Sequence, residues 1–142
     1  MQGKISMAAL DIPVSLDRLA DVRRFVTMQA DLAGLNEGQV DRLELAVVES
    51  VTNVIRHAVG LPPGATITLE VSRDAQAFWC TISYQGDEFK PPKPNDLDIL
   101  PEDFPEGGFG IFLIYSACDS VTFAYVCGRN ITCMEMRFES LG

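Results

Sequence analysis

The sequence is poor in positive charge: 11 Lys and Arg residues stand against 20 Asp and Glu, a formal net charge of −9. No Lys or Arg occurs between Lys93 and Arg129. Because nucleic acids and anionic membranes attract basic patches, this balance disfavours both as direct partners. The chain also lacks a run of 18 apolar residues, and its first residues lack the basic-then-apolar order of a signal peptide. We therefore expect a cytoplasmic protein.

Cysteine is sparse, and the Cys-x-x-Cys spacing typical of metal or redox sites is absent. Three of the four cysteines lie in apolar strand or helix runs, which favours buried reduced thiols over zinc ligands or disulfides. The hydrophobic fraction of 47% excludes a largely disordered chain. A length of 142 residues suits one core, so we expect a single domain over residues 1–142.

The strongest pattern lies in residues 43–58. At 100° per residue, one helical face carries only apolar side chains: Leu43, Val47, Val51, Val54 and Ala58. Glu49 and Asn53, four residues apart, flank this stripe, and His57 follows one turn later. Such residues can form a solvated flank, with His57 as a helix cap, or they can reach together into a cleft. Spacing alone leaves both interpretations open.

The other segments predict a fold in which helices cover a sheet. We expect strands at 4–12, 65–72, 77–84, 121–127 and 131–138, and helices at 16–33, 36–58 and 110–117. A turn at Gly128-Arg129-Asn130 would close the last hairpin. Residues 87–106 are rich in proline and acids and lack periodicity, which is typical of a lid. The predicted class is α+β, a two-layer sandwich with a mainly antiparallel sheet.

The string Glu-Ser-Val-Thr-Asn-Val-Ile-Arg-His-Ala at 49–58 resembles the N-box helix of the GHKL ATPase superfamily, in the form found in bacterial anti-sigma serine/threonine kinases. The resemblance implies that Asn53 ligates Mg²⁺ on the ATP phosphates and that Glu49 is the general base. It also places His57 among the nucleotide-binding residues. The order of the expected elements is similar to that of the Bergerat (histidine-kinase-like ATPase) fold, with the helices on one face.

A glycine cluster, Gly107-Gly108-Phe109-Gly110, precedes the apolar run Ile-Phe-Leu-Ile. Alone it could be a hinge, although a helix N-terminus also suits phosphate. With the run that follows, it resembles the family's second glycine box, which implies that Gly107, Gly108 and Gly110 close over the phosphates. Phe109 stands where the family usually has Arg. Thr132, near the family's last box, is assigned to the nucleotide site in the same way.

The segment that aligns with the first glycine box, Tyr84-Gln85-Gly86-Asp87-Glu88-Phe89, departs from the family pattern. Gly86 and Phe89 match it. Tyr84 replaces the Asp that accepts a hydrogen bond from the adenine amino group, and Glu88 replaces the second glycine. We expect the bulk of the Tyr84 ring to fall where adenine should lie. The Mg²⁺ side of the site is thus retained and the adenine side altered.

Two functions follow from this mixture. The first is an anti-sigma regulatory factor that binds Mg-ATP, sequesters a sigma factor and phosphorylates a serine or threonine of an anti-anti-sigma (STAS-type) partner. The second is a nucleotide-independent module on the same fold that regulates a partner by binding alone. Glu49 and Asn53 favour the kinase, whereas Tyr84, Glu88 and Phe109 favour the binding module. The resemblance is also compatible with a homodimer.

Overall fold

The computed structural model describes residues 3–91 and 108–139. Within them one antiparallel sheet has the strand order β1-β2-β3-β5-β4. Its strands are β1 (Ile5–Pro13), β2 (Thr66–Arg73), β3 (Ala77–Gln85), β4 (Ser120–Val126) and β5 (Arg129–Arg137). The helices are α1 (Leu19–Ala33), α2 (Glu37–His57) and α3 (Gly108–Ala117), with a 3-10 turn at Leu16–Arg18 before α1.

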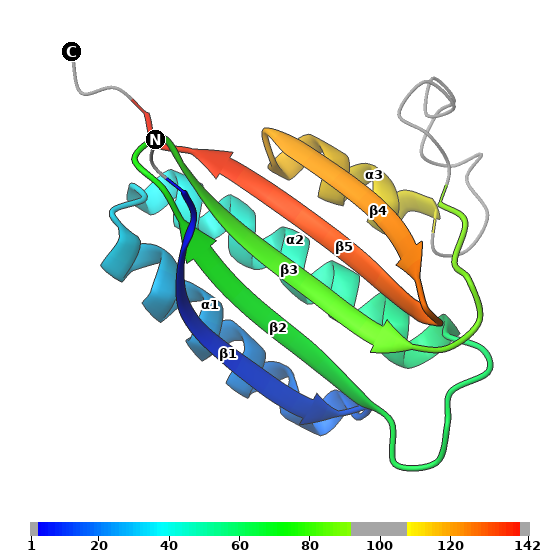
Figure 1. The fold of residues 1–142 in the computed structure, drawn as a ribbon. Coiled ribbons are helices and arrows are strands. Elements are labelled where there is room, and N and C mark those ends of the chain that lie inside the picture. The colour runs from blue at the N-terminus through cyan, green and yellow to red at the C-terminus, as the bar shows by residue number, and fades with distance from the viewer. Residues whose placement is uncertain (1–2, 92–107, 140–142) are drawn as a thin grey trace.

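The three helices α1, α2 and α3 lie on one face of the sheet, and none of them covers the other face (Figure 1). The middle helix, α2, contacts both α1 and α3. The predicted α+β two-layer sandwich is therefore confirmed.

Local sequence signals fix both ends of the α1–α2 connection. Gly34 ends α1 with φ = 106°, a left-handed conformation that glycine adopts without a Cβ clash. Asn36 then caps α2: its side chain accepts a hydrogen bond from the Gln39 backbone N–H at 2.9 Å. The Gln39 side chain accepts one in return from the Asn36 N–H at 3.2 Å, which completes a capping box. The α2 start is as predicted.

The core fills the space between α2 and the sheet. Leu43, Val47 and Val51 of the predicted apolar stripe are fully buried, and Val54 nearly so. On β3, burial alternates along the strand and turns Phe78, Cys80, Ile82 and Tyr84 toward the helices. The stripe thus orients α2 on the sheet and leaves Glu49 and Asn53 half-buried at its flank.

We expect Val47→Ala to lower the free energy of unfolding by about 1–3 kcal/mol, because buried methyl groups are lost and the cavity collapses only in part. Chemical denaturation measures this loss. The matched control is Leu45→Ala on the same helix, where the side chain is 45% exposed and the expected loss is below about 1 kcal/mol. Equal losses would contradict the assigned orientation of α2.

The closing hairpin differs from the sequence prediction. Its turn is formed by Cys127 and Gly128, which have φ values of 50° and 80°, and β5 begins at Arg129. Two consecutive positive φ values give the backbone twist that a two-residue hairpin requires. The predicted turn at residues 128–130 was therefore wrong: it began one residue too late and ended two residues too late. Asn130 is a strand residue, paired with Tyr84 of β3 and Tyr125 of β4.

The predicted burial of the cysteine thiols is confirmed for Cys80 alone. Cys80 is buried, Cys118 and Cys133 are half-buried, Cys127 is exposed, and all four are free thiols. Desolvation, reinforced by neighbouring Asp119, raises the pKa of the Cys118 thiol to about 12. In residues 3–91 and 108–139, no three His, Cys, Asp or Glu side chains gather in a way that could hold a metal ion. None of the described helices has the length and apolar character needed to cross a membrane.

Candidate functional site

The α2–α3 contact brings three of the predicted site residues together. A Cβ placed on Gly110 would lie 3.1 Å from Glu49 Oε2 and 3.2 Å from Asn53 Nδ2. Gly110 is itself buried, so α3 rests its third residue directly on the two polar side chains. Only a residue without a side chain allows this approach without displacing them. The carboxylate, the carboxamide and the glycine form one cluster.

The Asn53 carboxamide is incompletely satisfied within this cluster. Its Nδ2 atom is buried and has no hydrogen-bond partner among the described residues. A buried amide group without a partner costs free energy, and such groups in native proteins usually meet a ligand, ion or water. The amide can turn either its oxygen or its nitrogen toward a ligand. The donor set therefore fits a metal-bound phosphate, which needs both kinds of partner.

The other predicted site residues lie on different elements and differ in their burial. His57 is exposed at the last residue of α2, and Thr132 is nearly buried on β5. Gly108 begins α3, while Gly107 lies outside the described residues, as do residues 92–106 of the predicted lid. The nucleotide roles of His57 and Thr132 stay predictions.

Tyr84 lies on the helix-facing side of the sheet, at the end of β3. Its side chain is only 6% exposed, and its Cε2 atom lies 3.5 Å from the position of a Cβ on Gly86. Desolvation raises the pKa of the Tyr84 phenol, so the group is neutral at physiological pH. A neutral ring thus fills space between the sheet and the helices at this end of β3.

The chain that follows Tyr84 is held by several hydrogen bonds. We call Gly86–Phe89 the base-side segment. Its Asp87 N–H donates to the Val59 carbonyl, just beyond α2, at 2.8 Å, and Tyr125 Oη donates to the Gly86 carbonyl at 2.9 Å. The Phe89 and Phe123 rings meet edge-on, with their centroids 6.1 Å apart.

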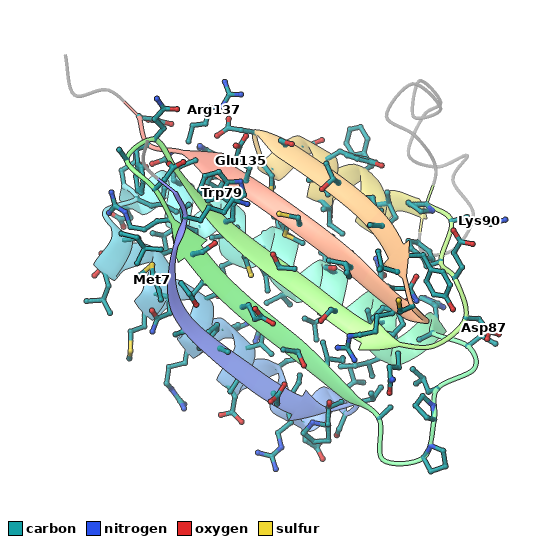
Figure 2. The ribbon with its side chains drawn as sticks, viewed as in Figure 1. Met7, Trp79, Asp87, Lys90, Glu135 and Arg137 are labelled. Carbon is teal, nitrogen blue, oxygen red and sulfur yellow. The ribbon has the colours of Figure 1, made fainter. Side chains whose placement is uncertain are left out.

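Figure 2 shows Asp87 and Lys90 at the end of the molecule where β3 ends, away from Trp79 and Glu135. The first residues of the predicted lid are thus docked.

Sequence reasoning missed Asn130, the residue that holds this segment most directly. Its Nδ2 donates to the Asp87 carbonyl at 2.9 Å, and its Oδ1 accepts from the Phe89 N–H at 2.9 Å. The residue was assigned to a turn, where Asn is common, so its burial was not anticipated. A correct two-residue turn would have placed it on the helix-facing side of β5, beside Tyr84.

The fold, the cluster and the capped central helix together define a class of protein. The chain belongs to the histidine kinase-like ATPase domain family, whose model matches residues 12–138. It is similar to the serine-protein kinase RsbW of Staphylococcus aureus strains JH9 and Newman, at 30% identity over 144 residues, which covers 93% of this chain and 87% of the relative. The anti-sigma kinase resemblance is therefore confirmed at the level of the family.

Two solved structures share the fold. The RsbU and RsbW domains of a Mycobacterium tuberculosis protein superpose with a TM-score of 0.63 at 12% identity, over 94% of this chain and 35% of that one. The histidine kinase domain of a blue-light activated kinase from Erythrobacter litoralis gives 0.51 at 16% identity, over 88% of this chain and 61% of that one. At these identities the likeness shows the fold alone.

Proposed function

We propose that this chain is an anti-sigma regulatory factor that binds Mg-ATP and phosphorylates a serine or threonine of an anti-anti-sigma (STAS-type) partner. The observation that carries the proposal is the contact of Gly110 with Glu49 and Asn53, which joins a carboxylate, a carboxamide and a helix N-terminal turn. Similarity to RsbW serine-protein kinases supports the reaction class. Free backbone N–H groups at the start of α3 suit phosphate oxygens.

Each residue of the cluster has a distinct role in this proposal. Asn53 would hold Mg²⁺ through its carboxamide oxygen, and its Nδ2 could donate to a phosphate oxygen. The bound metal supplies charge neutralisation for the phosphates. Glu49 accepts the proton of the attacking hydroxyl group as the oxygen–phosphorus bond forms. The bond from the γ-phosphorus to the β,γ-bridging oxygen breaks, and ADP leaves with the electron pair.

The proposal extends to partners and location. The chain acts as a single domain in the cytoplasm, binds a sigma factor and releases it when the anti-anti-sigma protein competes for the same molecule. A net charge of −9 favours partners with basic surfaces and accelerates their association. A homodimer is compatible with these roles.

An NMR titration with Mg-ATP tests the proposal. We expect wild-type binding with a dissociation constant on the order of 1 mM, about 4 kcal/mol, because Tyr84 replaces the adenine-binding carboxylate. Asn53→Ala should weaken it at least tenfold through loss of the metal ligand. Glu49→Gln should bind equally or more tightly, since a negative charge near the phosphates is removed while the base acts only during transfer.

Glu44→Gln is the control for charge, because it removes a carboxylate from the same helix. This carboxylate lies outside the cluster, with its Oε1 atom 3.9 Å from Arg23 Nε. Its affinity should equal that of the wild type. Asn53→Ala that binds Mg-ATP normally would refute the ligand role. Wild type that shows no Mg-ATP binding would refute the proposal and favour the nucleotide-independent binding module, to which the buried Tyr84 ring also points.

A further inference from the structure

The side chain of Asn130 continues the sheet where the strand backbone stops. Pairing between β3 and β5 ends at Gln85 and Arg129. Beyond this point the Asn130 carboxamide bonds the Asp87 carbonyl and the Phe89 N–H, each at 2.9 Å. These two groups flank one residue, as do the groups that a neighbouring strand would bond. The side-chain amide, with its donor and its acceptor side by side, takes the place of the backbone N–H and C=O of one strand residue.

We propose that Asn130 is a positioning residue that fixes the base-side segment, Gly86–Phe89, for the nucleoside end of the nucleotide. This inference rests on the proposed function, because it assigns a role within the same Mg-ATP site. Asn130 is 5% exposed and both ends of its amide are bonded. A buried polar group that is fully bonded holds its partners in a unique arrangement, whereas loss of one partner leaves an orphaned group.

The bonds of the segment connect it to α2, the helix that carries Glu49 and Asn53. Asp87 N–H bonds the Val59 carbonyl, two residues beyond the end of α2, and Gly86 N–H bonds the Gly128 carbonyl at 3.2 Å. Without the Asn130 amide, the carbonyl of Asp87 and the N–H of Phe89 lose their partners in the described chain. The segment would keep its bonds to Val59, Gly128 and Tyr125, but the backbone from Asp87 to Phe89 would lose the two bonds that fix it.

The proposed role predicts a selective defect. A nucleotide touches the Glu49–Asn53–Gly110 cluster with its phosphates and the base-side segment with its nucleoside. We call the two hydrogen bonds of the Asn130 side chain the clamp. Loss of the clamp therefore weakens the binding of Mg-ATP and spares the binding of Mg-tripolyphosphate, which has the same phosphate chain and no nucleoside. A merely structural role would weaken both ligands in parallel, because the whole fold would loosen.

The experiment compares wild type, Asn130→Ala and Asn130→Asp by NMR titration with each ligand and by amide exchange without ligand. In Asn130→Ala we expect Mg-ATP affinity to fall at least tenfold, Mg-tripolyphosphate affinity to stay within twofold and Phe89 amide exchange to accelerate at least tenfold. Asn130→Asp keeps the acceptor for the Phe89 N–H, so exchange there should stay slow while Mg-ATP binding weakens. This second variant separates the clamp from a failure to fold.

Ser83→Ala is the control. It removes a hydrogen bond that Arg129 donates to the Ser83 hydroxyl on the open face at the same end of the sheet, and it should change the affinity for neither ligand. Normal Mg-ATP binding by folded Asn130→Ala would overturn the positioning role and leave the proposed function standing. Parallel weakening of both ligands would also overturn it. Wild type that binds neither ligand would refute the proposed function and the nucleotide role of Asn130 together, whatever the Phe89 exchange rate.

Discussion

Gly110→Ala is expected to weaken Mg-ATP binding at least tenfold without lowering the melting temperature. The added methyl group would lie 3.1 Å from Glu49 Oε2 and 3.2 Å from Asn53 Nδ2, closer than ordinary van der Waals contact. Both side chains must move aside, which displaces the metal ligand and the proposed base together. Alanine is the better helix former by up to about 1 kcal/mol, so the folded state does not suffer. Differential scanning fluorimetry and NMR titration measure the two effects.

Gly38→Ala provides the comparison, since it also adds a methyl group to a helical glycine and its nearest neighbour there would be 3.5 Å away, in the first turn of α2. It should leave Mg-ATP affinity unchanged. If Gly110→Ala binds Mg-ATP as wild type does, the cluster is a packing contact and not a nucleotide site. A clear fall in the melting temperature of Gly110→Ala would also count against the site, because the loss of affinity could then come from a loosened fold.

The sequence predicted the elements whose signals are local and mutually consistent. The Asn36–Gln39 capping box, Gly34 at the end of α1 and the apolar stripe of α2 lie where periodicity and caps place them. These features depend on residues three or four apart, so they can be read without the rest of the fold. The approach of Glu49 to Asn53 belongs to the same class of prediction.

Contacts between residues far apart in the sequence could not be predicted in the same way. Gly110 lies 57 positions after Asn53, and the contact between them depends on how α3 packs on α2. Asn130 bonds residues more than 40 positions earlier, and the sequence prediction placed it in a turn, before a last strand that was expected to begin at residue 131. A residue assigned to a turn has no expected face of the sheet, so the position of Asn130 beside Tyr84 was not anticipated. The clamp was therefore hidden by the misplaced turn.

Tyr84→Asp is expected to lower the free energy of unfolding by about 3–5 kcal/mol. The ring is 6% exposed and packs in the helix-facing layer, so the substitution leaves a cavity and places an unpaired carboxylate in it. Tyr84→Phe keeps the ring and should cost no more than about 1 kcal/mol. Chemical denaturation of both variants measures the difference. A stable Tyr84→Asp protein would show that the ring is dispensable to the core.

Nucleotide should reverse part of this loss if the aligned position is the adenine site. A carboxylate at residue 84 can accept the hydrogen bond of the adenine amino group, and a removed ring leaves room for the base. We expect Mg-ATP to bind Tyr84→Asp/Glu88→Gly at least tenfold more tightly than wild type, about 1.4 kcal/mol. Because the pair of changes leaves net charge unaltered, overall electrostatics cannot produce the gain.

A ligand that binds only the folded state raises the stability of that state, so Mg-ATP should raise the melting temperature of the variant more than that of wild type. Equal affinities would mean that residue 84 does not face the base, and the site would then recognise its nucleotide through the phosphates and the base-side segment alone.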